Sequence, residues 1–272
     1  MREMREGEGL QVTGQLNAAL SESEALRTLE FRVLGTRLHA VSLAGAVAWV
    51  DAWAQTGSGG HIATVNPEFV MRARREPEFR QLLDRTRLNV PDGMGVVFAG
   101  RIGGVGVPER VTGVDLTLEI ARLAAWRNWR ILLVGGKPGV AELAARALVR
   151  KFPRMRKPTW VDVAPGPEGD PDAQRILGEG KPHIILVAFG APHQEYWIDR
   201  NVTGRWPSVA IGVGGTFDYL SGLTQRAPKV VQRAGLEWAF RLWRDPSRWR
   251  RMRVLPQFAI EAIREAAQGD KV

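Results

Sequence analysis

Short runs of apolar, mostly β-branched residues alternate along the chain with longer amphipathic segments, beginning near Arg32. Because a helix-length segment separates most of these runs, the pattern predicts a mostly parallel sheet flanked by helices, a Rossmann-like α/β fold. Six runs have the length and composition of strands: HIATV (61–65), RLNV (87–90), RILLV (130–134), TWVDV (159–163), HIILVAF (183–189) and SVAIGV (208–213).

Five of the six runs lead directly into loops that begin with Gly, Pro or Asn. Open α/β sheets bind ligands in the crevice outside the carboxyl ends of their strands. The sequence therefore predicts the functional site in these loops, which lie in the segments TVNPE, NVPDGMG, LVGGKPG, VAFGAPHQ and GVGGTFD.

The chain divides into three predicted parts. Residues 1–29 are polar and are predicted to form a mobile leader, with a loosely docked helix over 21–31 as the alternative. Residues 30–228 carry the strand pattern and form the α/β core. Residues 229–272 form a helical, Arg/Trp-rich appendage, with one helix over 229–244, a restart with Asp245 as N-cap and Pro246 at N1, and a segment after Pro256.

Composition narrows the classes of function. The 38 Lys and Arg against 29 Asp and Glu give a net charge of +9, and much of the excess lies after residue 225, which suggests a local acidic partner. The absence of cysteine excludes a disulfide framework, a thiolate metal site and a cysteine nucleophile. No window approaches the roughly 18 apolar residues of a membrane span, and the N-terminus lacks a signal-peptide core. We expect a cytoplasmic protein.

Three side chains at strand ends are the first candidates for chemistry. Asp92 in VPDGMG is the best general base, because its Pro and Gly neighbours restrict the carboxylate; a plain turn is the alternative. Thr64 and Asn66 would point to the same side of a strand, where hydroxyl and amide groups suit hydroxyl or phosphate recognition. The alternative is that Asn66 only caps the helix beginning at Pro67.

Two further loops carry candidate ligand groups. In GAPHQE, Gln194 offers donors and an acceptor to a sugar or base, and His193 is either catalytic or a surface residue. In GVGGTFD, the double glycine allows close approach of a ligand, with Asp218 just beyond it. The alternative for this loop is a tight packing turn.

A glycine-rich turn over 135–139 joins a strand to an Ala-rich helix, a geometry in which backbone N–H groups can face a diphosphate. It lacks the G-x-G-x-x-G and Walker patterns. Asp162 ends the following strand, where an acid would bind a dinucleotide ribose, so an NAD(P)-dependent oxidoreductase is an alternative hypothesis. The only D-x-D, Asp170 to Asp172, equally suits a helix N-cap, and we expect no metal site.

The tail combines arginines with aromatic residues. Arg241, Arg244, Arg248 and Arg251 recur at i, i+3, i+7 and i+10, which predicts one basic stripe if a single helix runs through them. The tryptophans among them favour a membrane-interface or phosphate-binding surface over a merely solvated face. Binding of nucleic acid is the rival hypothesis, but it gives Asp92 no role.

Taken in order, these segments resemble the WecG/TagA/CpsF family of bacterial glycosyltransferases over residues 32–254. The resemblance implies an inverting, metal-independent transferase without a cofactor. It would move an N-acetylhexosamine, with N-acetylmannosamine as first choice, from a UDP-sugar to undecaprenyl-diphosphate-linked GlcNAc in cell-wall polysaccharide synthesis, such as that of teichoic acid. Glucosyl or uronosyl transfer in exopolysaccharide or enterobacterial antigen assembly is the alternative. The resemblance rests on TVNPEFV, VPDGMGVV, ERVTGVDL, LLVGGKPGV, GAPHQEYWI, GVGGTFDYLSGLTQRAP and GLEWAFRLWRDPSRWRR.

The resemblance also implies residue roles. Asp92 would deprotonate the acceptor hydroxyl, and Thr64, Asn66 and Gln194 would line the same pocket. The UDP portion would lie against Asp218 and the glycines Gly135, Gly136, Gly139, Gly214 and Gly215. The appendage would close over the site at the inner face of the cytoplasmic membrane and meet the lipid diphosphate through Arg241, Arg248 and Arg251. The residues after 254 exceed the family's usual end and bear on membrane docking or on a homo-oligomer.

Overall fold

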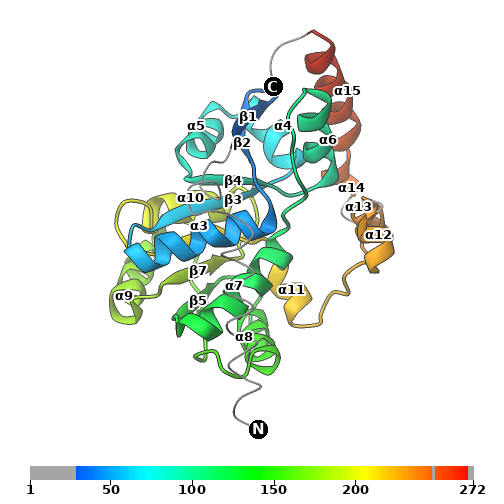
Figure 1. Ribbon diagram of the computed structural model, residues 1–272. Coiled ribbons are helices and arrows are strands. Elements are labelled where there is room, and N and C mark those ends of the chain that lie inside the picture. The colour runs from blue at the N-terminus through cyan, green and yellow to red at the C-terminus, as the bar shows by residue number, and fades with distance from the viewer. Residues whose placement is uncertain (1–28, 234, 247–248, 269–272) are drawn as a thin grey trace, which may run out of the picture.

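The structure, a computed structural model, describes residues 29–233, 235–246 and 249–268. A sheet of six parallel strands in the order β4-β3-β8-β7-β5-β6 forms its centre (Figure 1), which confirms the predicted α/β fold. Each strand coincides with one of the six predicted runs. The strands are β3 (Gly60–Val65), β4 (Leu88–Pro91), β5 (Ile131–Val134), β6 (Thr159–Val161), β7 (Ile184–Val187) and β8 (Val209–Gly212).

Nine helices of the described core surround the sheet: α3 (Leu43–Thr56), α4 (Pro67–Arg75), α5 (Pro77–Arg85), α6 (Met94–Ile102), α7 (Gly113–Arg127), α8 (Val140–Lys151), α9 (Asp170–Gly180), α10 (His193–Asn201) and α11 (Thr216–Leu220). Strand side chains alternate between two apolar layers. Leu133 and Ile211 pack with residues of α3, α7 and α8, whereas Leu132 and Ala210 pack with residues of α9 and α10. Burial on both faces explains why these strands are continuously apolar.

An antiparallel hairpin of β1 (Leu29–Val33) and β2 (Thr36–Ala40) lies beside the sheet and was not predicted. Its turn residues Leu34 and Gly35 have φ of 49° and 78°, the left-handed conformation that two-residue hairpin turns adopt. The helix considered over 21–31 is wrong at residues 29–31, because they belong to β1. The predicted leader up to residue 28 lies outside the described residues.

The C-terminal segment departs from its predicted helices. The single helix over 229–244 is wrong, because Gly235, with φ of 74°, lies between two separate helices. Pro246 lies in a helical turn, as the predicted restart requires, and a further helix covers Trp249–Met252 beyond residues 247–248, which lie outside the described residues. The last one begins before Pro256, since a proline in the first turn removes an N–H that has no intrahelical partner. The helices are α12 (Lys229–Arg233), α13 (Glu237–Arg244), α14 (Trp249–Met252) and α15 (Val254–Ala267).

Helix α15 packs against α4 and α6, as Figure 1 shows. Phe258 and Ala262 are buried in the apolar cluster around these helices. Leu34 N donates to Glu265 Oε2 at 2.8 Å, which ties α15 to the hairpin turn. Helix α15 therefore shares an apolar core with the α/β part. The domain boundary between residues 228 and 229 stays a prediction. No helix of the described residues is both long and apolar enough to cross a bilayer.

Candidate active site

A cavity of about 420 Å³ lies at the carboxyl ends of the central strands. Its walls come from the segments that follow β3, β4, β7 and β8, from the first turns of α4, α6 and α7, and from α11, α13 and α15. This is the place where open α/β sheets bind ligands. The cavity brings together seven of the predicted site residues: Thr64, Asn66, Asp92, Gln194, Gly214, Gly215 and Asp218.

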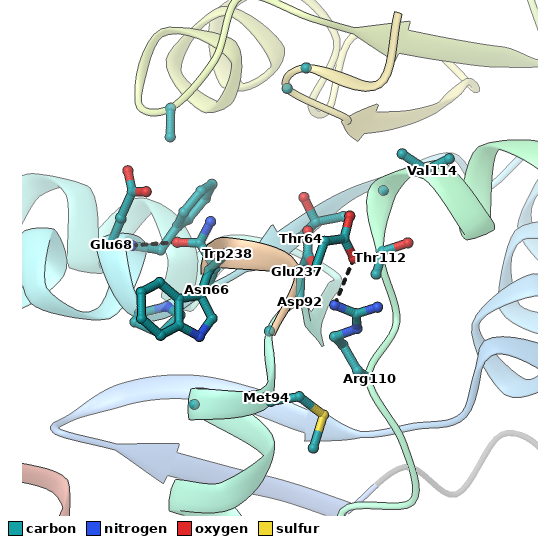
Figure 2. A pocket seen from close by; sticks show the side chains of 18 of the residues that line it. Thr64, Asn66, Glu68, Asp92, Met94, Arg110, Thr112, Val114, Glu237 and Trp238 are labelled. Atoms are coloured by element: carbon teal, nitrogen blue, oxygen red, sulfur yellow. Dashed lines mark hydrogen bonds and ion pairs between the residues drawn. The ribbon is translucent and has the colours of Figure 1, made fainter. Parts of the chain in front are cut away.

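Asp92 follows β4 directly and lines the cavity with a partly buried side chain. Its backbone N–H donates to Val65 O at 2.8 Å, so the sheet ladder extends to this residue and fixes its position. Figure 2 shows Asp92 in the same part of the cavity as Thr64, Thr112 and Arg110. A carboxylate held on a rigid strand end beside a cavity is suited to accept a proton from a bound hydroxyl.

Thr64 and Asn66 line the cavity and also make structural hydrogen bonds. Thr64 Oγ1 donates to Gly212 O at 2.9 Å, which joins β3 to its neighbour β8. Asn66 Oδ1 accepts from Phe69 N at 3.1 Å and caps α4, the alternative considered from the sequence. Its Nδ2 group makes no hydrogen bond to the described residues, so the amide has two donors to offer a ligand.

Gln194 joins two loops of the cavity wall and is only 2% exposed. Its Oε1 accepts from Gly190 N at 3.1 Å and from Gly214 N at 2.9 Å, and its Nε2 donates to Glu195 Oε1 at 2.8 Å. Gly190 lies after β7 and Gly214 after β8. The side chain of Gln194 therefore fixes the spacing of two strand ends at the site.

The glycines of the 135–139 turn do not line this cavity. Gly135 and Gly136 have φ of 78° and 90°. A Cβ at Gly135 would lie 2.5 Å from Phe189, and one at Gly136 would lie 3.3 Å from Phe217. Close packing and the left-handed turn account for both glycines, while Gly139 has open space around its Cβ position.

A cluster of charged side chains beside the cavity was not assigned from the sequence. Arg110 Nη1 donates to Glu237 Oε2 at 2.9 Å, as Figure 2 shows. Arg226 Nη2 donates to Asp115 Oδ2 at 2.7 Å, and Arg226 Nε lies 3.7 Å from Glu237 Oε1. Glu237 is 4% exposed and belongs to α13. These buried charges therefore hold α13 against the core.

The cluster keeps its charges through mutual hydrogen bonds. The hydrogen bonds from Arg226 to Asp115 raise the pKa of Arg226, although burial lowers it. The negative charges of Asp115, Glu237 and Asp92 raise it further. Burial would raise the pKa of Asp115, but hydrogen bonds from Arg226 and Thr112 outweigh it, so this pKa is lowered. Arg226 therefore stays cationic within electrostatic reach of Asp92.

A second cavity of about 510 Å³ lies beside the first and shares with it the residues Glu68, Phe69, Gly190 and Ala191. Three arginines line it: Arg72, Arg75 and Arg253. Arg72 is paired with Glu76 at 2.8 Å. With three arginines against Glu68 in its lining, the second cavity carries a positive balance that favours anionic ligands.

Comparison with known proteins decides the family. The profile of the glycosyl transferase WecG/TagA/CpsF family matches residues 31–272. The chain belongs to this family. Membership confirms the predicted resemblance and the assignment as a glycosyltransferase, and it gives no support to the oxidoreductase hypothesis.

Three relatives of this WecG/TagA/CpsF member share the name N-acetylglucosaminyldiphosphoundecaprenol N-acetyl-beta-D-mannosaminyltransferase. The one from Bacillus subtilis is 32% identical over 76% of this chain and 80% of its own length. The Bacillus spizizenii protein is 30% identical over 78% of this chain and 82% of its own. The Staphylococcus aureus protein is 28% identical over 72% and 77%.

The arginine tail of this family member is described only in part. Arg248 lies outside the described residues, as do the side chains of Arg241 and Arg251. The predicted stripe depended on a helix that continues past Pro246, whereas α13 ends at Arg244; the stripe itself stays a prediction. Trp238 lines the cavity, whereas Trp243 is 73% exposed.

Three weaker candidates lie away from both cavities. His193 and Asp162 are exposed. Asp170 accepts from Arg200 Nε at 3.0 Å and from Asn201 Nδ2 at 2.6 Å, so its carboxylate joins α9 to α10. Within the described part of the chain, no three His, Asp or Glu residues are grouped as metal ligands would be.

Sequence reasoning missed four residues that the structure brings to the site. Arg110, Thr112, Glu195 and Glu237 all lie within segments that carry the family resemblance, namely ERVTGVDL, GAPHQEYWI and GLEWAF. Their position in those segments was the one signal in the sequence that could have marked them as site residues. Arg110 and Glu237 are partners 127 positions apart, so no local pattern indicates that pair.

Proposed function

We propose that this protein is an inverting, metal-independent glycosyltransferase. It moves N-acetylmannosamine from its UDP donor to undecaprenyl-diphosphate-linked GlcNAc, in the synthesis of a cell-wall polymer such as teichoic acid. The relatives' shared name supports the sugar and the acceptor. The observation that carries the proposal is Asp92, a carboxylate fixed at a strand end beside a cavity large enough for a sugar.

Asp92 acts as the general base of a single displacement. Its carboxylate takes the proton of the acceptor hydroxyl while that oxygen forms a bond to the anomeric carbon. The bond from this carbon to the UDP oxygen breaks, and its electron pair leaves with UDP. Because attack and departure occur on opposite faces, the configuration inverts. Thr64, Asn66 and Gln194 orient the reacting sugars.

Positive groups of the chain offset the charge that develops on UDP. Arg110 lines the cavity, Thr112 caps the N-terminus of α7 there, and Arg226 lies behind Thr112 and donates to its hydroxyl at 3.3 Å. Arginines and helix N-termini stabilise a departing diphosphate without a metal ion. Gly214, Gly215 and Asp218 hold the UDP portion, since the glycines leave room beside the backbone. Gly135, Gly136 and Gly139 are omitted from this assignment because they lie off the cavity.

The acceptor is lipid-linked, so the protein docks on the inner face of the cytoplasmic membrane. Exposed Trp243 and Trp249 suit the interfacial region of a bilayer, and the surrounding arginines suit its anionic surface. Arg241, Arg248 and Arg251 meet the lipid diphosphate. The second, arginine-lined cavity offers further room beside the Asp92 cavity for the anionic part of the substrates.

The test is transfer by the Asp92→Asn variant. Purified protein is incubated with UDP-N-acetylmannosamine and a lipid-diphosphate GlcNAc, with EDTA present, and product is measured by chromatography. Loss of the base lowers turnover by about 10²- to 10⁴-fold, while calorimetry finds UDP affinity unchanged. The matched control is Asp172→Asn, at a side chain that is 69% exposed on α9.

Three outcomes would reject parts of the proposal. Turnover within a few-fold of wild type in Asp92→Asn removes the base assignment. Transfer that requires added magnesium removes the metal-independent mechanism. Faster transfer from UDP-glucose or a UDP-uronic acid under the same conditions replaces the proposed donor with one of the alternatives.

A further inference from the structure

A buried carboxyl group lies directly behind the cavity wall. Glu195 is 0% exposed and does not line the cavity. Its Oε1 accepts from Gln194 Nε2 at 2.8 Å, and its Oε2 has no hydrogen-bond partner among the described residues. A buried acid with so few partners costs free energy. Its contact with Gln194 therefore needs an explanation other than stability.

The hydrogen-bond partners of the Gln194 amide determine which of its two ends is the oxygen. Its oxygen accepts from two backbone donors, Gly190 N and Gly214 N, and only an oxygen can do this. The nitrogen must then face Glu195. One Nε2 hydrogen goes to the carboxyl, and the other has no acceptor among the described residues. Gln194 itself lines the cavity.

The Gln194 and Glu195 side chains are packed tightly against the backbone of β8. A Cβ at Gly212 would lie 2.4 Å from Glu195 Oε1 and 2.5 Å from Gln194 Nε2. The carboxyl and amide therefore lie against bare backbone, and the carbonyl of this same Gly212 accepts from Thr64 Oγ1. Thr64, Gln194 and Glu195 are thus connected through one residue of β8.

We propose that Glu195 is a positioning residue for the transfer reaction, which holds the Gln194 amide with one N–H directed at the bound sugar. The inference rests on the proposed function and deepens it. Glu195 touches no substrate, because it lies outside the cavity lining. It acts through Gln194, which joins the ends of β7 and β8 and presents the remaining donor.

The main variant is Glu195→Met, which keeps an unbranched side chain of similar length and removes the oxygen acceptor. We expect kcat to fall about 10- to 100-fold, the range typical of lost supporting hydrogen bonds at a site, with the KM for the UDP-sugar changed less than threefold. Glu195→Gln keeps a carbonyl that can accept from Gln194 Nε2. It should recover most of the loss.

A double-mutant cycle separates positioning from general stability. In the Gln194→Ala background, Glu195→Met should cause little further loss of kcat, because the group that it positions is gone. Equal losses in both backgrounds would overturn the proposal, and so would wild-type kcat in Glu195→Met. If neither Glu195→Met nor Glu195→Ala folds, the carboxyl serves the fold itself, which also overturns it.

Amide hydrogen exchange tests the same proposal without an activity assay. The N–H groups of Gly190 and Gly214 donate to Gln194 Oε1, so Glu195→Met should speed their exchange more than tenfold, whereas the amides of α8 should not change. Exchange that stays at the wild-type rate would contradict the role of Glu195. If the wild type transfers no sugar but this exchange effect is present, the proposed function fails while the positioning role stands.

Discussion

The ionisation of Glu195 should affect the free energy of unfolding, and this effect can be tested without any substrate. Burial raises the pKa of this carboxyl from 4.5 to about 8, and the hydrogen bond from Gln194 opposes the rise only in part. The unfolded chain releases the proton near pH 4.5, whereas the folded protein retains it up to about pH 8. The folded state therefore binds more protons between these values, and stability falls as pH rises through this window.

The magnitude follows from the width of the window. At about 1.4 kcal/mol per pH unit, the interval from 4.5 to about 8 corresponds to about 5 kcal/mol of lost unfolding free energy. Native domains have about 5–15 kcal/mol in total, so the loss is readily measured. Glu195→Gln cannot ionise and should escape it. Other titrating groups, such as the buried His61, are common to both proteins and cancel in the difference.

The assay is urea denaturation of both proteins at one-unit steps from pH 4 to pH 9. The difference in unfolding free energy should move in favour of Glu195→Gln by several kcal/mol up to pH 8 and then level off. Curves that stay parallel across this range would show that the carboxyl has an ordinary pKa. A difference that moves in favour of the wild type would reverse the sign of the argument and refute it.

Two further predictions concern contacts that the fold creates. Glu237→Gln should lower stability by about 3–5 kcal/mol, because it leaves Arg110 without its buried counter-charge; urea titration measures the loss, and an equal loss in an Arg110→Met background would argue against this pairing. Gly212→Ala should cost about 1–3 kcal/mol by overpacking Glu195, together with a lower kcat; an unchanged thermal midpoint would contradict it.

The sheet was predictable because its signal is local. The strands β5, β7 and β8 are buried on both faces and so appear as apolar runs, each followed by a turn residue. The carboxyl ends meet at one edge, so Thr64, Asp92 and Gln194 could be placed together before the fold was known. The hairpin was missed because one of its turn residues, Leu34, is not a usual residue for positive φ.

The charged cluster could not be predicted, because its partners are distant in the sequence. Arg110 and Glu237 are 127 positions apart, and Arg226 and Asp115 are 111 apart. The sequence also predicted one helix over 229–244, but Gly235 lies between the two separate helices α12 and α13. The helical spacing of side chains does not predict a common face across a break between two helices.

Residues that line the cavity differ in what their substitution can reveal. Thr64 and Gln194 each satisfy backbone groups, so variants at these positions leave buried carbonyl or N–H groups unpaired and weaken the fold together with the reaction. A loss of kcat at either residue therefore assigns contact with substrate only if stability is unchanged. Asp92→Asn keeps the shape of the side chain and the backbone hydrogen bond to Val65 O, and removes the basicity and the charge of the carboxylate. The base assignment is for this reason tested more cleanly than the roles of its neighbours.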